Sequence, residues 1–583
     1  MNRSTRRIGM NSLILMAIGL SMMAVGYFLY SKFLGSRIYR LSDSYKTPAH
    51  TMEDGVDYVP TNKYVLWGHH FTSVAGAAPI IGPAVAVIWG WLPAFLWVTI
   101  GTVFMAGMHD LGALWASQRH RGQSIGTLSG RYIGARGRNL FLVVIFLLLL
   151  MVNTAFGVVI SNLLVSTPTS VIPTWGAIIV ALLVGQAIYR LKWSLPLVSV
   201  VGVVALYTLM IIGDRFPIVL PETVLGIPAN GVWIIVLFVY AFIASLLPVW
   251  MLLQPRDYIN GLQLFIGLGI LYASFLFTAP DVVAPALRDN LPAETPGIFP
   301  LLFVTIACGA ISGFHGMVAS GTSSKQLDKE TDARFVGYFG AVGEGLLALG
   351  TIIATTSGFK TLADWEQIYS EWNAGGVSAF VEGGGNLINE GLGISTSLSA
   401  TILATMAVLF AATTMDSGVR LQRFVVQEIG EIMGFKIGAL GATSIAVGIA
   451  FALTFSQGAD GSGGMTIWPL FGTTNQLMAG LSLAVIMVIL THLRRPTWPV
   501  AIPLIFVTAM SLWAAVKQLG TLWAAQNWLL FAMDVVIVVA AVWVIVEVIG
   551  AVSAARKAPP VEWGDEDTDA PNPVRQSADV PVA

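Results

Sequence analysis

The feature that most constrains this chain is a series of long apolar runs. A helix that crosses the hydrocarbon core of a bilayer needs about 20 mostly apolar residues, and the sequence holds about fifteen such stretches. Only 11% of the 583 residues are charged, against about 25% in soluble domains. We therefore predict an all-α polytopic membrane protein whose spanning helices are centred near residues 20, 80, 104, 150, 181, 205, 242, 268, 309, 346, 405, 446, 479, 508 and 539.

Lys and Arg gather in alternate loops between these stretches. With the N-terminus outside, about 24 of the 31 Lys and Arg residues fall in the inner loops and the C-terminal tail. Positive charge favours the cytoplasmic side of a membrane. The distribution therefore indicates a cytoplasmic C-terminus and supports the number of crossings.

Composition and motifs exclude several classes of protein. A net charge of −1 argues against nucleic acid as a partner. The single cysteine, Cys308, excludes a disulfide framework and a multi-cysteine metal cluster. The sequence has no phosphate-binding glycine loop followed by Lys-Ser/Thr, no nucleophile elbow and no HExxH motif. We therefore expect no enzyme activity and no cofactor, and the oligomeric state stays open.

The stretch GHHFTSVAGAAPIIGP, residues 68–83, is a poor continuous helix. Glycine and proline destabilise a helix interior by about 1 and 3 kcal/mol relative to alanine. Irregular backbone at membrane depth is tolerated where it lines a cavity or is buried in protein, although a merely kinked helix is the plainer alternative. At a break the polar and flexible residues are candidates for substrate binding, namely His69, His70, Thr72, Ser73 and Gly76.

A second interruption is expected five spans later, at residues 242–260, where Ser245 and Pro248 lie in an apolar run. The predicted orientation makes these two spans run in opposite directions. Oppositely directed, interrupted helices are typical of the inverted repeats of secondary transporters, which bind substrate at the paired breaks. The pattern predicts a five-plus-five inverted-repeat core, with Ser245 and Pro248 as further substrate-binding candidates. An ordinary proline kink is the alternative.

Few ionisable residues fall inside the predicted spans, and charges at such depth usually mark function. Carboxylates and histidines there can exchange protons near neutral pH, which predicts proton coupling. Sodium is an alternative, because the hydroxyls of Ser320, Thr322 and Ser323 could ligate it. The candidates for proton or ion coupling are Asp110, His315, Ser320, Glu344 and Asp416, with His109 beside Asp110.

Some of these residues also have a plainer interpretation. Asp416 lies near Arg420 and Arg423, and we favour it as a buried hydrogen-bonded residue that ties helices together. His69 and His70 could belong to a metal site. Because no carboxylate or cysteine lies near them in sequence, we predict no metal.

The sequence contains five long motifs: GVDYVPTNKYVLWGHHFTSVAGAAPIIGP (residues 55–83), LPVWMLLQPRDYIN (247–260), CGAISGFHGMVASGTSSKQ (308–326), TTMDSGVRLQRFVVQE (413–428) and WPLFGTTNQLMAG (468–480). They resemble, in the same order, the carbon starvation protein A family. The resemblance implies a symporter of the bacterial cytoplasmic (inner) membrane that takes up peptides, or pyruvate with protons, under nutrient limitation. It also implies membership of the amino acid–polyamine–organocation superfamily and a leucine-transporter-like fold.

These observations divide the chain into five regions. We predict a peripheral N-terminal helix (1–34), an inverted-repeat transport core (64–425), an outer loop or lid inserted in the core (357–394), additional transmembrane helices (436–552) and a disordered cytoplasmic tail (553–583). The leading hypothesis is a proton-coupled importer of a small carboxylate such as pyruvate, or of short peptides. A sodium-coupled symporter, a nutrient sensor without net transport and an ion channel are the alternatives.

Overall fold

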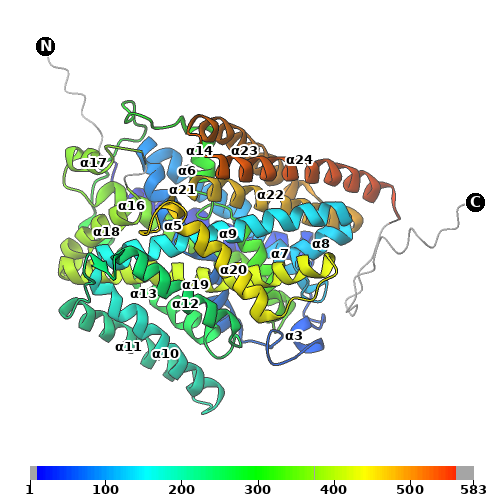
Figure 1. Ribbon diagram of the computed structural model, residues 1–583, viewed down its shortest axis with the longest axis horizontal. Coiled ribbons are helices and arrows are strands. Elements are labelled where there is room, and N and C mark those ends of the chain that lie inside the picture. Colours follow the sequence, from blue (N-terminus) through cyan, green and yellow to red (C-terminus); the bar gives the residue numbers. More distant parts are fainter. Residues whose placement is uncertain (1–9, 373–374, 560–583) are drawn as a thin grey trace, which may run out of the picture.

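The computed structural model describes residues 10–372 and 375–559, most of which lie in helices. Two ends of the molecule can be distinguished along its long axis (Figure 1). One end holds α17 (Leu362–Ile368), and the other holds α8 (Ile125–Tyr132). They are called the α17 face and the α8 face below.

Twelve helices in the described part of the chain are long and apolar enough to cross a membrane. The apolar window of α22 is 94% buried and that of α11 only 22%, so α22 belongs to the centre of the molecule and α11 to its edge. The twelve are Ser12–Ile38 (α1 to η2), Trp91–Gln118 (α6, η4 and α7), Ala135–Ser166 (α9), Pro168–Ile188 (η5 and most of α10), Leu195–Arg215 (α11), Ala229–Leu246 (α12), Leu253–Thr278 (α13), Glu330–Ser357 (η7 to α16), Thr396–Ile432 (α19), Trp468–His492 (α22), Trp498–Ala524 (α23) and Trp528–Lys557 (α24).

Three further predicted spans do not meet this criterion as single helices. The pair α4 (Lys63–Ala75) and α5 (Ala78–Ala86) would make a thirteenth span, bent by 44°. The predicted span near residue 309 is divided into α14 (Ile298–Thr305) and α15 (Gly313–Gly321). The helix α20 (Ala439–Thr454) has 16 residues. The count of about fifteen therefore stays a prediction.

The break between α4 and α5 lies inside the stretch 68–83, where the sequence predicts one. Gly76 ends α4 with φ +55°, in the region that glycine adopts most readily. A Cβ at this position would lie 2.8 Å from the Thr414 hydroxyl oxygen of α19. Both the backbone conformation and the close contact therefore require glycine here.

The second broken helix is not where the sequence analysis put it. α12 is regular through Ser245 and ends at Leu246, so Pro248 follows a helix end rather than interrupting a spanning helix. The residue before a proline is driven to extended backbone, and Leu247 has φ −75° and ψ 150°. A second break in the helical structure, between the short helices α14 and α15, lies at residues 306–312.

Side chains of neighbouring helices satisfy the backbone at this second break. Trp97 of α6 donates to the carbonyls of Phe303 (3.3 Å) and Ile306 (3.2 Å). Gln476 of α22 donates to Phe303 at 3.0 Å, and the Asn475 side-chain oxygen accepts from the Phe314 amide at 2.9 Å. Such partners are required because lipid offers no hydrogen bonds to free backbone groups.

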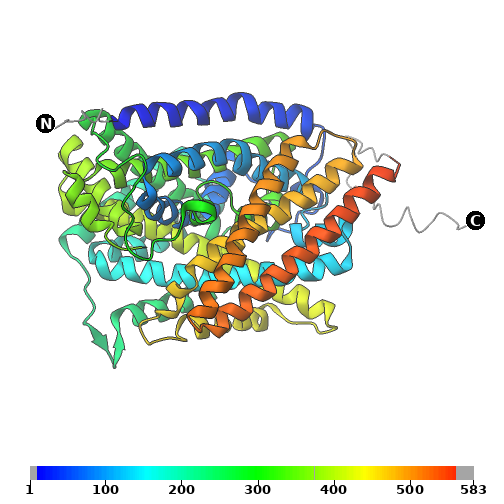
Figure 2. The ribbon, with the colours of Figure 1, turned by 90° about the horizontal axis from the view of Figure 1, so that it is seen from above.

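The remaining helices surround this centre. The long helices α9 and α19 pack side by side, α10 and α11 form a hairpin at one edge, and α23 and α24 lie at another (Figure 1). Viewed at 90°, α1 runs along one side of the molecule, and α23 and α24 run obliquely across the molecule (Figure 2). The start of α1, near α17, and the end of α24 therefore lie at opposite ends of the molecule.

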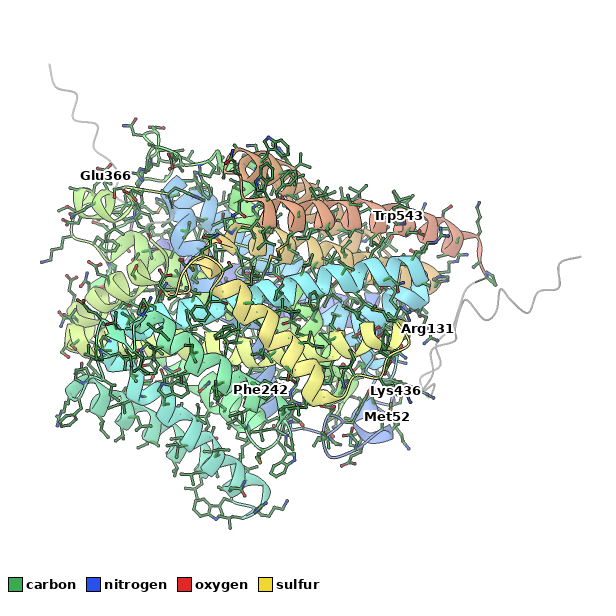
Figure 3. All side chains as sticks on the ribbon, viewed as in Figure 1. Met52, Arg131, Phe242, Glu366, Lys436 and Trp543 are labelled. Carbon is green, nitrogen blue, oxygen red and sulfur yellow. The ribbon has the colours of Figure 1, made fainter. Side chains whose placement is uncertain are left out.

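The predicted outer segment 357–394 is largely helical, within the residues that are described. It forms α17 and α18 (Gly376–Leu392), and α18 packs against α5, α13, α16 and α19. Glu366 lies at this α17 face, whereas Arg131 and Lys436 lie toward the α8 face (Figure 3). The basic residues named here are thus on the end that the sequence analysis expects to be cytoplasmic.

The two chain ends are described only in part. Of the tail predicted to be disordered, residues 553–557 continue α24 as helix, which corrects that prediction, and residues 560–583 lie outside the described residues. The predicted N-terminal helix begins at Ser12 and extends to Ile38. Within the merged spans, the individual helices are α1 (Ser12–Val25), α6 (Trp91–Gly101), α7 (Gly107–Gln118), α10 (Val171–Tyr189), η8 (Arg334–Tyr338) and α16 (Phe339–Ser357). Further short elements are α3 (Pro48–Thr51), α21 (Gly463–Thr466), β1 (Thr223–Val224), β2 (Ile227–Pro228), η3 (Val87–Trp89) and η6 (Ser323–Lys325).

The contact between α5 and α14 provides a test of this fold. A Cβ at Gly82 would lie 2.5 Å from the Thr305 carbonyl oxygen. Gly82→Ala is therefore expected to destabilise the protein by about 1–3 kcal/mol, the usual cost of overpacking, measured by thermal unfolding in detergent. Gly448→Ala in α20 is the control, since its Cβ meets nothing within 4 Å. If both variants are as stable as wild type, α5 and α14 do not approach this closely.

Candidate functional site

A cavity of 460 Å³ joins the two broken helices. It touches Ala78, the first residue of α5, and also Thr305, Ala307 and Cys308 at the end of α14. The start of α22 and parts of α23 and α24 form the rest of its wall, and Trp372 reaches it from the segment after α17. The cavity thus lies beside both helix breaks and is lined in part by aromatic residues.

The cavity wall is mostly apolar. Hydroxyl and amide groups come from Thr305, Thr466, Gln518 and Thr521. Of the described residues that line the cavity, Glu294 alone carries a charge. A helix start presents free N–H groups and a helix end presents free carbonyls. At the start of α5, Pro79 has no N–H and the amides of Ile80 and Ile81 bond to the Ala77 carbonyl, which leaves the Ala78 amide as the candidate donor to an anionic group. The end of α14 can offer carbonyls to a cationic group.

A cluster of three uncharged side chains lies directly behind the cavity. Asn475 donates to the Cys308 sulfur at 3.0 Å and to the Ser312 hydroxyl at 3.0 Å. Its side-chain oxygen also caps α15, as described above. Asn475 therefore connects the cavity wall at Cys308 to the first turn of α15.

That first turn of α15 carries a chain of buried histidines and carboxylates. His109 Nδ1 lies 2.8 Å from one oxygen of Asp110, and His315 Nδ1 lies 2.9 Å from the other. His315 Nε2 lies 2.8 Å from a carboxylate oxygen of Glu344. All four side chains are at most 1% exposed. These four side chains are called the relay below: hydrogen-bond contacts run from His109 through Asp110 to His315, and the contact from His315 to Glu344 is a close ion pair without hydrogen-bond geometry. Histidines and carboxylates are the side chains that exchange protons most readily near neutral pH.

Small residues allow the three helices of this relay to approach. A Cβ at Gly316 would lie 3.0 Å from the His109 ring, so a glycine leaves room for the imidazole. Gly309 lies in the break before α15, and a Cβ at this position would lie 3.0 Å from the Cβ of Ala348. Ala348 follows Glu344 by one turn of α16. The relay is therefore packed directly against the α14–α15 break.

A second buried network ties α4 to α12, α13 and α19. His69 Nδ1 lies 2.7 Å from Asp257, which also accepts from Arg256 at 2.8 Å. Arg256 in turn forms an ion pair with Asp416 of α19, and the Tyr240 hydroxyl of α12 donates to Asp416 at 2.9 Å. The network contains two carboxylates and one guanidinium, with a histidine at its α4 end.

The structure brings some of the predicted site residues together. Asp110, His315 and Glu344 form the relay, while His69 and Asp416 belong to the second network.

Other predicted residues make contacts around α4. The Thr72 hydroxyl donates to the carbonyls of Gly68 (2.6 Å) and Asp257 (3.2 Å), and Ser417 donates to the Ser73 hydroxyl at 3.2 Å. His70 Nδ1 lies 2.9 Å from the Ser323 hydroxyl. These contacts hold α4 against its neighbours. None of the three predicted residues Thr72, Ser73 and His70 is among those that line the 460 Å³ cavity.

The two remaining substrate-binding candidates lie away from the breaks. The Ser245 hydroxyl donates to its own helix at Phe242, and its carbonyl accepts from Arg423 at 2.8 Å. Pro248 follows the end of α12. Sequence reasoning missed Arg256, Asp257 and Asn475. The first two stand in the motif QPRDYIN, inside the interruption predicted at residues 242–260, whereas α13 already begins at Leu253.

A smaller cavity of 290 Å³ lies nearer the α8 face, and Ser320 is part of its wall. The Ser320 hydroxyl accepts from the Ile125 amide at 3.0 Å and donates to Gly316 at 2.6 Å. Lys325 closes one side, with its ammonium 5.3 Å from the Tyr58 ring centre, and burial lowers the pKa of this lysine. Among the described residues, no group of three or more His, Cys, Asp and Glu side chains could hold a metal ion.

The fold resembles that of a solved structure. It matches the crystal structure of a manganese transporter from Eremococcus coleocola with a TM-score of 0.51, over 86% of this chain and 99% of that one. The two sequences are 11% identical, so the likeness concerns the fold alone.

The sequence itself places the chain in a family. The family described as Carbon starvation protein CstA matches residues 11–364 and 358–514, and the chain belongs to it. The chain is 31% identical to the peptide transporter CstA of Campylobacter jejuni, over 85% of this chain and 78% of the relative. It is 30% identical to the peptide transporter CstA of Bacillus subtilis (89% and 91%) and 28% identical to the pyruvate/proton symporter BtsT of Escherichia coli (86% and 81%). These relatives are transporters, which argues against an enzyme.

The relay predicts a ranking of two variants. Asp110 contacts two imidazoles, whereas Glu344 contacts one. An amide at position 110 can accept from one ring only and turns its NH₂ group toward the other. Asp110→Asn is therefore expected to cost about 3–5 kcal/mol, the usual effect of breaking a buried pair, and Glu344→Gln less. Thermal unfolding in detergent at neutral pH measures both. An equal or larger loss for Glu344→Gln contradicts this arrangement.

Proposed function

We propose that this protein is a secondary active transporter that imports a small carboxylate or a short peptide together with protons across the bacterial cytoplasmic membrane. The observation that carries the proposal is the cavity at the two helix breaks, packed against the buried relay from His109 to Glu344. Intramembrane titratable groups beside a cavity are typical of proton-driven transport. In this proposal the α8 face is cytoplasmic, as the loop charges indicate.

The core of this transporter is proposed to be a five-plus-five inverted repeat. The broken helix α4–α5 then corresponds to α14–α15, which runs in the opposite direction in the predicted orientation. The long helices α9 and α19, which pack against each other, take equivalent places in the two halves. The short helix α8 before α9 corresponds to α17 and α18 before α19, and α10 and α11 form an inserted hairpin. Substrate sites at paired breaks are the rule for this architecture.

Proton binding and substrate binding are coupled through α15. His315 lies between the carboxylates of Asp110 and Glu344, so the charge of the relay depends on the protons it holds. An uncompensated charge at this depth is costly, so a change in protonation alters how α15 packs against α7 and α16. Because the first turn of α15 is linked to the cavity wall through Asn475 and Cys308, solute and proton can act on the same element.

The cavity fits the two kinds of solute that the relatives' names give. A carboxylate, common to pyruvate and to a peptide, is met by the Ala78 amide at the start of α5. The amino group of a peptide is met by Glu294 and by the carbonyls at the end of α14. A volume of 460 Å³ is in the range of small-molecule sites.

Transport measurements test the proposal. Purified protein in proteoliposomes should take up labelled pyruvate or labelled dialanine faster with an inward proton gradient. One pH unit supports about tenfold accumulation per proton, because one unit equals 1.36 kcal/mol. Glu344→Gln should lose this stimulation. If the proton gradient does not change the uptake of either solute by the wild-type protein, proton coupling is ruled out.

The single cysteine offers an independent test of the binding place. Cys308 lines the cavity, so a small charged thiol reagent should label it. The transported solute at ten times its Kd should slow labelling about tenfold, because it occupies most of the sites. Mass spectrometry gives the rate, and Cys308→Ala should show no labelling. Labelling that does not change at any solute concentration places the solute elsewhere.

A further inference from the structure

The two cavities of the protein lie at opposite ends of α15. The 460 Å³ cavity touches Cys308, in the break before this helix. The 290 Å³ cavity touches Met317, Ser320 and Gly321, in the last turns of the helix, and α8, α9 and α19 form most of its remaining wall. The two cavities have no lining residue in common among those described, and the smaller one lies nearer the α8 face (Figure 1).

The smaller cavity contains a cation without an anionic partner. Within the described part of the chain, two charged side chains line it, Lys325 and Glu428. The Lys325 ammonium lies 5.3 Å from the ring centre of Tyr58 and 5.4 Å from that of Phe424, and no carboxylate of the described residues forms an ion pair with it. Aromatic faces attract a cation but offer it no oxygen. The ammonium is therefore available to the carboxylate of a ligand.

Four other charged groups surround Lys325 outside the cavity. Asp54 and Asp57 attract its ammonium, and Arg420 and Arg423 repel it. Asp57 also lies 3.8 Å from Arg420, and Asp54 accepts from three backbone amides of its own loop. Both arginines donate to backbone carbonyls at the end of α12. None of the four is among the residues that line the cavity, so a ligand there meets Lys325 directly.

The start of α8 adds polar groups to the wall. The amides of Ile125 and Thr127 donate to hydroxyl groups, which leaves the Gly126 amide as a candidate donor to a ligand. The dipole of a helix start also favours an anion. The hydroxyl oxygens of Ser124 and Thr127 are 3.0 Å apart, and the Thr127 side chain forms a hydrogen bond with Glu428. Polar groups thus continue from the start of α8 to Glu428.

Glu428 is the anionic group of the cavity. It lies one turn of α19 beyond Phe424, a rise of about 6 Å. A wider hollow of 620 Å³ shares Glu428 and adds Arg138 and Glu431, so it continues the cavity toward the end of α19. Arg138 attracts the Glu428 carboxylate and Glu431 repels it, but neither lines the smaller cavity. The Glu428 carboxylate can therefore meet an amino group of a ligand in this cavity.

The separation of the two charges suits a short peptide. Each residue of an extended chain spans about 3.5 Å, so a dipeptide is about 7 Å long and a single amino acid half as long. A pyruvate ion has no amino group to place at Glu428. The apolar part of the wall accommodates small apolar side chains; it is formed by Leu142, Ile145, Leu149, Met317, Leu421 and Val425.

We propose that the 290 Å³ cavity is a second solute site, in which a short peptide binds with its carboxylate at Lys325 and its amino group at Glu428. This site rests on the proposed function, which makes the α8 face cytoplasmic and the cavity a place from which solute is released. A peptide bound here does not touch Cys308, so the site is distinct from the one at the helix breaks.

A thiol placed in the cavity reports on its occupancy. Gln123 lines the cavity and can be replaced in the cysteine-free Cys308→Ala background. Dialanine should slow the labelling of the Gln123→Cys thiol by a charged thiol reagent, measured by mass spectrometry. N-acetyl-dialanine lacks the amino group and dialanine amide lacks the carboxylate. Each should need about tenfold more for equal protection, the usual effect of losing a hydrogen bond to a charged group.

Two variants in the Gln123→Cys protein assign the two ends of the ligand. With Lys325→Gln, dialanine and dialanine amide should protect equally. With Glu428→Gln, dialanine and N-acetyl-dialanine should protect equally. Glu431→Gln is the matched control and should keep the ranking, because Glu431 lines the wider hollow only. A ranking that Lys325→Gln leaves unchanged overturns the proposal, and so does protection by pyruvate equal to that by dialanine.

Lys325 is itself a second probe that needs no substitution. Burial lowers its pKa, so a larger fraction of it than of an exposed lysine is neutral and reactive toward acetic anhydride. Dialanine should slow the acetylation of Lys325 relative to that of Lys436, which is exposed toward the same end of the molecule (Figure 3). The ratio corrects for anhydride that dialanine consumes. An unchanged ratio contradicts the site even where the Gln123→Cys thiol does not react.

These readings are independent of transport. Gradient-driven uptake of dialanine without protection of either probe refutes the second site and leaves the proposed transporter in place. If both probes are protected but uptake does not change with the proton gradient, proton coupling fails and the second site stands.

Discussion

The structure depends on the satisfaction of backbone groups where helices are interrupted in the interior of the protein, between α4 and α5 and between α14 and α15. In lipid each free N–H or carbonyl costs several kcal/mol, so a broken helix can exist only among suitable neighbours. At the α14–α15 break these neighbours are Trp97, Gln476 and Asn475, which come from helices far apart in sequence. This requirement fixes the positions of α6 and α22 beside the α14–α15 break, and with them the walls of the cavity between the two breaks.

Buried charge is the second constraint, and the molecule handles it in two separate places. The relay on α7, α15 and α16 contains two carboxylates and two histidines, while the network on α4, α13 and α19 also holds a permanent cation, Arg256. A histidine can change its charge near neutral pH and an arginine cannot. The relay is thus suited to bind and release protons. The network with Arg256 is suited to fix the position of a helix.

Much of this organisation could be predicted from the sequence. The apolar runs predicted most of the helices. The glycines and prolines at residues 68–83 correctly predicted the break between α4 and α5. The depth of Asp110, His315 and Glu344 marked them as functional candidates, although their mutual contacts needed the fold. Pro248 is a conspicuous helix breaker, but it follows the end of α12 and does not interrupt a spanning helix. The break at residues 306–312 has the sequence IACGAIS, which contains no proline. Such a break is created by hydrogen bonds from other helices, which local sequence does not contain.

The same reason explains why the second network escaped prediction. Arg256 and Asp257 follow a short loop in the sequence, where charged residues are usually solvated. Only the packing of α13 against α4 and α19 places them in the interior. Asp416 was expected to be a hydrogen-bonded tie between helices, and its contacts with Arg256 and Tyr240 have that form.

Asn475 has a mechanical consequence for α15. Its amide has no titratable proton, so it holds the first residues of that helix in the same way at every pH. One residue beyond this anchor, at His315, the helix meets partners whose charge does change. The first turn of α15 therefore combines, in adjacent residues, a contact that is the same at every pH with contacts to ionisable side chains.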